Sequence, residues 1–244
     1  MAASDTPWLV VPTYNEADNL EALTDAALRV LSAAAPEGFV MLVVDDGSPD
    51  GTGQLADRLA AEHEPVRVLH RSEKAGLGPA YLAGFAAAMA GGAGYVIEMD
   101  ADFSHDPPDL ARLLAAARAG ADLVLGSRYV DGGGVTDWGA LRRLVSRAGS
   151  LYARWMLGLA VHDLTGGFKC FSRATLEAID FPSVRSRGYA FQIELTYRAA
   201  RCGCEIVELP IVFRERRRGQ SKMSSRIALE AFWRVPQMRL RGRR

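Results

Sequence analysis

Two carboxylates stand one residue apart where a short apolar segment ends. Asp100 and Asp102 follow the run Tyr95–Met99, which predicts a buried strand. In an open α/β sheet, ligands gather at the carboxyl ends of the strands, and residues two apart on extended chain point the same way. Neighbouring carboxylates repel each other unless a cation or a shared proton intervenes. The pair therefore indicates a site for Mg²⁺ or Mn²⁺, although a solvated turn before a helix would contain the same residues.

Acidic side chains also follow two earlier apolar segments. Tyr14 offers an aromatic face for stacking, and Glu16 offers a carboxylate that accepts from ribose hydroxyls or a base. Alternatively, Asn15 caps the following helix and Glu16 complements its dipole. Asp45 and Asp46 cannot point the same way on extended chain, so we expect one to orient the turn and the other to face the site.

Cationic side chains that could bind phosphates come from two later segments. Arg128 follows a predicted strand, and Arg216 and Lys222 belong to a basic cluster near the end of the chain. Arg binds phosphate oxygens in a planar fork and Lys supplies a compact charge, although a solvated basic run would have the same composition. Residues 214–244 contain eleven Lys/Arg and two Glu, a net charge of +9, so the remainder of this neutral chain carries −9. This asymmetry indicates that the tail meets something anionic.

The composition is that of a single globular domain. The chain has 244 residues, 49% of them hydrophobic and 24% charged, which suits one α/β domain with a substantial core. No apolar run approaches the roughly 20 residues of a spanning helix, and no signal peptide is visible.

The three cysteines lack metal-ligand spacing, and their odd number argues against a disulfide framework, so we expect a cytoplasmic protein. The acidic body and the few aromatic residues in the basic tail argue against nucleic-acid binding.

Strands and helices alternate regularly in the first half. Strands are expected at Trp8–Val11, Val40–Asp45, Val66–His70, Tyr95–Met99 and Asp122–Gly126, and helices at Ala17–Ala34, Asp50–Glu64, Gly78–Ala90 and Pro107–Ala119. Later segments predict helices at Ala140–Leu157, Tyr189–Cys202 and Ser225–Val235, a strand at Glu205–Phe213, and irregular chain entering a strand at Asp163–Phe171. The pattern predicts an α/β fold with a mostly parallel central sheet flanked by helices.

Taken together, these motifs resemble a known family. Residues 12–16, 44–52 and 99–102 resemble the family-two glycosyltransferases of the GT-A fold. Residues 126–129, 163–169, 188–194 and 216–223 are similar to those of dolichol- or polyprenol-phosphate mannose synthases. The resemblance extends from about Trp8 to Phe232, and the ordered set is far more specific than any one motif.

The resemblance implies a role for each matching position. The guanosine part of GDP-mannose would be held by Pro12, Tyr14, Glu16, Val44 and Asp46. Asp100, Ala101 and Asp102 would surround the diphosphate, with Asp100 and Asp102 on Mg²⁺ or Mn²⁺ and Asp102 the principal ligand. Arg128, Arg216 and Lys222 would hold the diphosphate or the acceptor phosphate, and with Asp102 they form the expected catalytic set. One archaeal-type pattern has a Gln as a further metal ligand where this chain has Ser104.

The implied reaction is inverting transfer of mannose from GDP-mannose to a polyprenyl or dolichyl monophosphate. The alternatives are a polyprenyl-phosphate glucose synthase that uses UDP-glucose, and a non-catalytic nucleotide-sugar-binding subunit. The single domain would comprise a nucleotide-sugar half at about 8–128, an acceptor-side half at about 129–222 and an amphipathic basic segment at about 223–244. We expect Ile227–Met238 to contact the cytoplasmic face of a membrane, and a separate membrane-anchoring subunit is a further expected partner by analogy.

Asp163 and His105 have two interpretations each. Asp163 lines the sugar or acceptor side, or it caps a turn. His105 contacts the metal, or it belongs to the approach to the helix that begins near Pro107.

Overall fold

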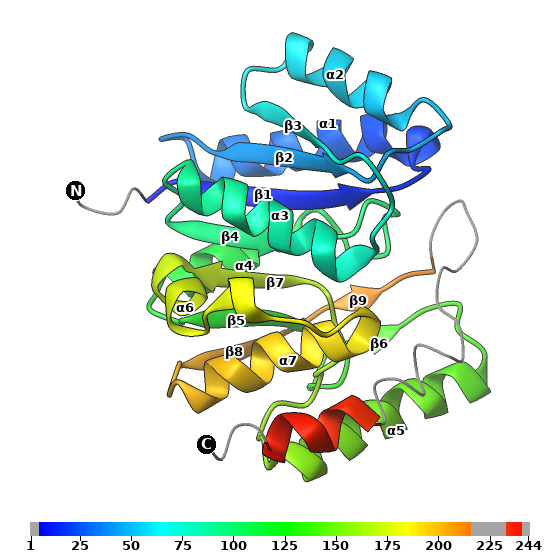
Figure 1. The fold of residues 1–244 in the computed structure, drawn as a ribbon, viewed down its shortest axis with the longest axis vertical. Helices are drawn as coiled ribbons and strands as arrows, with labels where there is room; N and C mark the ends of the chain where they lie inside the picture. The colour runs from blue at the N-terminus through cyan, green and yellow to red at the C-terminus, as the bar shows by residue number, and fades with distance from the viewer. Residues whose placement is uncertain (1–4, 216–232, 241–244) are drawn as a thin grey trace.

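A seven-stranded sheet forms the centre of the computed structural model, which describes residues 5–215 and 233–240 (Figure 1). Its order is β3-β2-β1-β4-β7-β5-β8, and every strand except the antiparallel β7 runs in the same direction. The strands are β1 (Pro7–Thr13), β2 (Val40–Asp45), β3 (Val66–His70), β4 (Tyr95–Glu98), β5 (Leu123–Ser127), β7 (Lys169–Ser172) and β8 (Ile206–Pro210). A small parallel pair, β6 (Gly134–Val135) with β9 (Val212–Phe213), lies beside it.

Helices cover both faces of the sheet. One face carries α1 (Ala17–Ala34), α2 (Thr52–Glu62) and α4 (Asp109–Arg118); the other carries α3 (Leu77–Ala90), α7 (Gly188–Arg201) and the 3₁₀ turn η1 (Phe181–Ser183). The remaining helices are α5 (Ala140–Leu157), at the far end from α2 in Figure 1, and the short α6 (Arg173–Ala178).

Alternating side chains of the central strands supply two hydrophobic cores. On β1, Leu9 and Val11 pack toward α1 and α4, whereas Trp8 and Val10 pack toward α3. All four are buried, because a mostly parallel sheet with helices on both faces hides both sets. Gly84 lets α3 approach the sheet closely, since a Cβ at this position would lie 2.3 Å from Val10 Cγ1. Helix α3 contacts β1, β2 and β4.

The expected α/β fold with a mostly parallel sheet is confirmed. The expected positions of the strands and helices in the first half agree with the structure to within a few residues. Residues 169–172 form the antiparallel β7, which inserts between β4 and β5 and joins the two halves of the sheet. The expected strand at Glu205–Phe213 is interrupted at Ile211, where the chain leaves β8 for β9.

The predicted C-terminal helix Ser225–Val235 falls largely outside the described residues. Residues 233–240 are helical and pack beside α5 and α7, with Val235 and Met238 buried in the core. Met238 therefore does not belong to a membrane-facing stripe, contrary to expectation. Arg239 Nη1 donates to the Met156 carbonyl at 2.5 Å and ties this helix to α5. Over the ranges 5–215 and 233–240, no helix has the length and apolar character needed to span a membrane.

Candidate functional site

The loops that leave β1 and β2 are hydrogen-bonded to each other at the carboxyl edge of the sheet. The backbone N–H of Asn15 donates to Ser48 Oγ at 3.0 Å, and that of Glu16 donates to Thr52 Oγ1 at 2.9 Å. Asp50 accepts from the backbone N–H of Ala17 at 3.3 Å, so the β2 loop satisfies donors at the start of α1. The cap residue of α1 is Glu16 and not Asn15, and the Glu16 side chain makes no capping hydrogen bond to the helix backbone.

Asp45 orients its turn as expected, whereas the expectation that Asp46 faces the site stays a prediction. Asp45 accepts from Ser48 Oγ at 2.5 Å and from the Ser48 backbone N–H at 3.3 Å, so it orients its own turn. Asp46 forms an ion pair with Arg71, at the end of β3. Lys74, from the same loop, places its ammonium 3.8 Å from the centre of the Tyr14 ring. The β3–α3 loop therefore supplies two cations beside the residues predicted to hold a nucleoside, and sequence reasoning missed both.

Other positions predicted for the nucleotide are partly or fully enclosed. The side chains of Val44 and Ala101 are buried in the core, so only their backbone atoms could touch a ligand. Pro12 is partly exposed. Glu16 is largely buried and accepts from Asn19 Nδ2 at 3.0 Å.

Asp100 and Asp102 lie beyond the end of β4, which stops at Glu98. The expectation that both carboxylates sit on extended chain is wrong, because Asp102 lies in a turn and Phe103 has a φ of 60°. Their relative placement depends on this turn and its hydrogen bonds. Asp102 Oδ1 accepts from the Ser104 backbone N–H at 3.0 Å.

Tyr81, on α3, orients the other carboxylate. Its hydroxyl donates to Asp100 Oδ1 at 3.1 Å. Its ring is completely buried and stacks on Phe191 of α7, with 6.2 Å between ring centroids. Burial, with the added effect of the nearby carboxylates, raises the pKa of Tyr81 well above its ordinary value, so the hydroxyl keeps the proton that it donates. The position of Asp100 is thus fixed from the helical layer as well as from its own turn.

The residues available at this turn suit a divalent ion. Two carboxylates are the hard oxygen donors that Mg²⁺ and Mn²⁺ prefer. The Ser104 hydroxyl is buried next to Asp102 and has no hydrogen-bond partner within residues 5–215 and 233–240. No group of three His, Cys, Asp or Glu residues that could hold a metal ion is found in these ranges, so a metal here would need further oxygen ligands such as the phosphates of a nucleotide.

Arg128 forms an ion pair within the protein, with Asp163. Its Nε and Nη2 each lie 2.7 Å from a different oxygen of Asp163, and its backbone N–H donates to the same carboxylate at 3.0 Å. Burial opposes the charge on Arg128, but Asp163 outweighs it and raises the guanidinium's pKa above its ordinary value. Glu208 of β8 fixes the Asp163 turn by accepting its backbone N–H at 2.9 Å.

Aromatic rings surround the Arg128 guanidinium. Its Cζ lies 5.2 Å from the centre of the Tyr129 ring, 5.7 Å from that of Trp138 and 5.5 Å from that of Phe213. The pair with Asp163 and these aromatic rings hold the Arg128 guanidinium in place, and the expected contact of Arg128 with a phosphate stays a prediction. Asp163 therefore pairs with a cation, and it also accepts from Thr165 Oγ1 at 3.4 Å within its own turn.

His105 is packed between aromatic rings. Its ring is buried, stacks on Phe168 with 4.8 Å between centroids, and meets the edge of Phe213. Burial lowers its pKa to about 4, and its Nδ1 accepts from the Asp100 backbone N–H at 3.4 Å. The neutral imidazole therefore supports the acidic turn, in agreement with the interpretation that places it on the approach to α4.

A buried polar cluster lies beneath the acidic turn. Glu98 of β4 is the register partner of Lys169 on β7, and both are fully buried. Lys169 Nζ donates to the backbone carbonyl of Gln192 at 2.9 Å and to its Oε1 at 2.5 Å. Burial raises the pKa of Glu98 to about 7, against the opposing effects of Lys169 and Gln192. A glutamate within an apolar strand was the available sequence signal for this cluster.

Arg216 and Lys222 lie outside the described residues, so the structure does not place them relative to the acidic turn. Within the described part of the chain, Arg71 pairs with Asp46, Lys74 lies over the Tyr14 ring, and Arg214 donates its backbone N–H to the Ser104 carbonyl at 3.1 Å.

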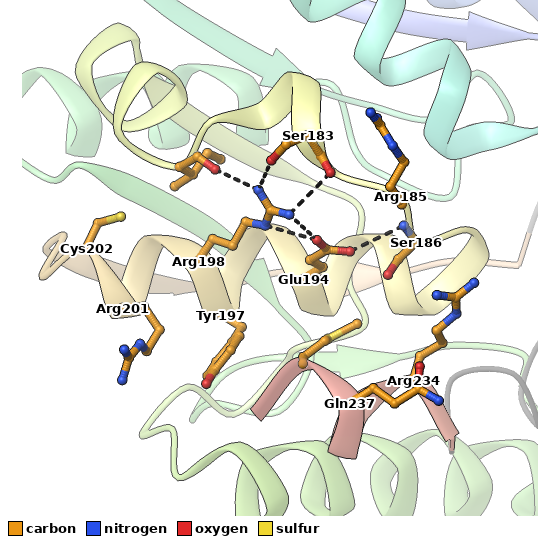
Figure 2. Close-up of a pocket in the computed structure, with 12 residues that line it drawn as sticks. Ser183, Arg185, Ser186, Glu194, Tyr197, Arg198, Arg201, Cys202, Arg234 and Gln237 are labelled. Atoms are coloured by element: carbon orange, nitrogen blue, oxygen red, sulfur yellow. Dashed lines mark hydrogen bonds and ion pairs between the residues drawn. The ribbon is translucent and has the colours of Figure 1, made fainter. Parts of the chain in front are cut away.

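A cavity of about 340 Å³ lies away from these residues, between η1, α7 and residues 233–240 (Figure 2). Arg198 crosses its wall and donates to Glu194 Oε1 through Nε at 2.9 Å and to Ser183 Oγ at 2.6 Å. Its charge is neutralised where it joins α7 to η1. The residues that line this cavity include none of those predicted for the nucleotide or the metal.

Comparison with known proteins gives one matching family and similar proteins named as transferases or synthases. Residues 8–180 match the model of the family described as glycosyl transferase family 2. The chain is 49% identical over 236 residues to polyprenol monophosphomannose synthase of Mycolicibacterium smegmatis, covering 96% of this chain and 87% of that protein. It is 51% identical over 234 residues to undecaprenyl-phosphate mannosyltransferase of Micrococcus luteus, covering 96% and 94%.

Two solved structures show the same fold. Glucosyl-3-phosphoglycerate synthase from Mycobacterium tuberculosis, in complex with Mn²⁺, UDP-glucose and phosphoglyceric acid, superposes with a TM-score of 0.72 at 22% identity, covering 97% of this chain and 80% of that one. The mannosyltransferase PcManGT from Pyrobaculum calidifontis, in complex with GDP-Man and Mn²⁺, gives a TM-score of 0.58 at 18% identity, covering 97% and 73%.

Proposed function

The chain belongs to glycosyl transferase family 2, and from this premise we propose that it transfers mannose from GDP-mannose to the phosphate of a polyprenyl monophosphate. The names of the two curated relatives, each about half identical over nearly the whole chain, support the sugar and the acceptor class. The observation that carries the proposal is the acidic edge, where Asp46, Asp100 and Asp102 follow β2 and β4 of one sheet.

The nucleoside would lie over the ends of β1 and β2. Guanine offers N–H donors that suit the Asp46 carboxylate, beside a carbonyl oxygen that suits the Arg71 guanidinium. Tyr14 is held under Lys74 and presents an aromatic surface at the same edge. The Glu16 carboxylate would accept a hydrogen bond from a ribose hydroxyl.

Asp100 and Asp102 would hold Mg²⁺ or Mn²⁺ together with the diphosphate. A bound divalent ion supplies Lewis-acid stabilisation to the departing diphosphate. Tyr81 and the backbone N–H of Ser104 keep the two carboxylates in place for this role. Arg216 and Lys222 are proposed to complete the charge around the phosphates.

The reaction is a single displacement at C1 of the sugar. An oxygen of the acceptor phosphate forms the bond to C1 while the bond from C1 to the diphosphate breaks, so the configuration inverts and GDP departs. The acceptor is already an anion at neutral pH, and no proton has to be removed from it. This reaction needs no general base from the chain, in keeping with the neutral, buried state of His105.

The acceptor is a lipid, so the enzyme would work at a membrane surface, on the cytoplasmic side where nucleotide sugars are available. A separate membrane-anchoring protein is a proposed further partner.

The test incubates the purified full-length protein, Mg²⁺ and a short polyprenyl phosphate with labelled GDP-mannose, GDP-glucose or UDP-glucose. Label that enters organic solvent from GDP-mannose alone is the expected result. Label from UDP-glucose would replace the proposal with a polyprenyl-phosphate glucose synthase. Absence of transfer from every donor, with nucleotide binding intact, would favour a non-catalytic subunit.

A further inference from the structure

Arg214 brings a cation to the acidic turn, at a position that the sequence motifs do not single out. It directly follows β9, and its backbone N–H donates to the Ser104 carbonyl at 3.1 Å. The N–H of the same Ser104 donates to Asp102 Oδ1 at 3.0 Å. One residue earlier, the rings of Phe213 and His105 meet edge to face, with 5.4 Å between their centroids. Two successive residues therefore hold the end of β9 against the turn that carries Asp102.

The guanidinium of Arg214 is held only by a solvent-exposed ion pair. Its Nη2 lies 3.2 Å from Oδ2 of Asp106, and the two side chains are 53% and 35% exposed. An ion pair this open to solvent contributes little to stability, so a new anion can replace the carboxylate at little cost. A guanidinium also has five N–H donors, more than one carboxylate accepts. Arg214 is therefore suited to bind an anion that arrives at the turn.

Arg128, the cation expected at a phosphate, is held more firmly. Its side chain is 5% exposed, and two of its nitrogens donate to separate oxygens of Asp163. Withdrawing a guanidinium from a buried pair of this kind is costly, because the carboxylate is left buried without its partner. Arg214 can turn toward a phosphate without that cost.

Negative charge accumulates when a nucleotide diphosphate binds beside this turn. Asp100, Asp102 and Asp106 already place three carboxylates within residues 100–106. A divalent ion offsets part of the charge, and a guanidinium binds phosphate oxygens in a planar fork. We propose that Arg214 is a further substrate-binding residue, which donates to the metal-bound diphosphate of the nucleotide sugar. The identity of this ligand rests on the proposed function.

Displacement of a fluorescent GDP analogue from the full-length protein, with Mn²⁺ present, tests the proposal. The competitors are GDP and guanosine, which differ in the diphosphate. Arg214→Gln removes the charge, and Arg214→Lys keeps the charge without the planar fork. Arg58→Gln is the matched control, because Arg58 of α2 is 56% exposed and pairs with Glu21. Thermal unfolding establishes that each variant is folded.

Arg214→Gln is expected to weaken GDP binding about tenfold and to leave guanosine binding unchanged, because guanosine has no phosphate to lose a donor. Arg214→Lys should recover part of the loss, and Arg58→Gln should bind both competitors as the wild type does. Equal GDP affinity in Arg214→Gln and the wild type would overturn the proposal. An equal fall in the affinities for GDP and guanosine would overturn it as well, because Arg214 would then only hold the turn in shape.

Transfer assays separate this inference from the proposed function. A wild type that binds GDP and transfers no mannose, together with a selective loss of GDP affinity in Arg214→Gln, would contradict the proposed function and support the role of Arg214. A wild type that binds UDP in place of GDP, with UDP affinity lost in Arg214→Gln, would keep Arg214 at a diphosphate and change the donor. A wild type that binds neither nucleoside diphosphate would overturn both.

Discussion

Arg128 and Asp163 form a buried ion pair in which two guanidinium nitrogens each lie 2.7 Å from a separate carboxylate oxygen. Arg128 directly follows β5, and Asp163 lies in the loop before β7, so the pair joins two segments 35 residues apart. The aromatic rings of Tyr129, Trp138 and Phe213 surround it. The pair holds the chain that leaves β5 against the loop that precedes β7.

Asp163→Asn should destabilise the protein by about 3 kcal/mol, because it leaves the Arg128 charge buried without its partner. Urea unfolding followed by circular dichroism measures the effect. Glu21→Gln is the control, since it removes the exposed Glu21–Arg58 pair, whose loss should change stability by less than about 1 kcal/mol. Equal unfolding midpoints for Asp163→Asn and wild type would show that the buried pair does not hold this region.

Tyr81→Phe should weaken Mn²⁺ binding in the presence of GDP by about tenfold or more, because Asp100 loses the hydroxyl that orients it. Titration calorimetry gives the affinity directly, without turnover. Tyr95→Phe, at the opposite end of β4, is the control and should bind Mn²⁺ as the wild type does. Unchanged affinity in Tyr81→Phe would remove Tyr81 from the support of the metal site.

Lys169→Met should destabilise the metal-free protein by about 3 kcal/mol at pH 8, because Glu98 then lies buried with no opposite charge. The pKa of Glu98, about 7, is above its ordinary value of 4.5, so between these pH values the folded chain holds a proton that the unfolded chain has lost. The contribution of this carboxyl to stability therefore falls as the pH rises from 4.5 to 7.

The loss caused by Lys169→Met should consequently be smaller at pH 5, where Glu98 is protonated and needs no cation. Glu98→Gln/Lys169→Met should recover part of the stability at pH 8, because no charge remains buried. Urea unfolding at both pH values measures these differences. A loss that does not depend on pH would mean that Lys169 acts through packing alone.

The first half of the fold was predictable because its signals are local. Apolar runs such as Val40–Asp45 are followed by turn residues and then by helices of ordinary length. Strand β7 was harder to assign because it has only four residues, and its insertion between β4 and β5 depends on pairing with distant segments. Helix α6 was also harder to assign, because it has only six residues.

Within the site, the acidic residues were predictable from their position after strands. Arg71 and Lys74 were missed because an isolated cation in a loop has no pattern, and only the fold brings it to Asp46 or Tyr14. The ion pair between Arg128 and Asp163 could not be predicted either, since the two residues lie far apart in sequence.

The most direct test compares wild type with Asp102→Asn for transfer of labelled mannose from GDP-mannose to a polyprenyl phosphate. Asp102→Asn keeps the size of the side chain and leaves an oxygen that can accept the Ser104 backbone N–H, so the fold should survive with its unfolding midpoint little changed. We expect the wild type to make lipid-linked mannose and the variant to lose at least about 99% of that rate, since a ligand of the divalent ion is lost. Wild-type turnover by Asp102→Asn would contradict the assignment of the acidic turn as the catalytic centre.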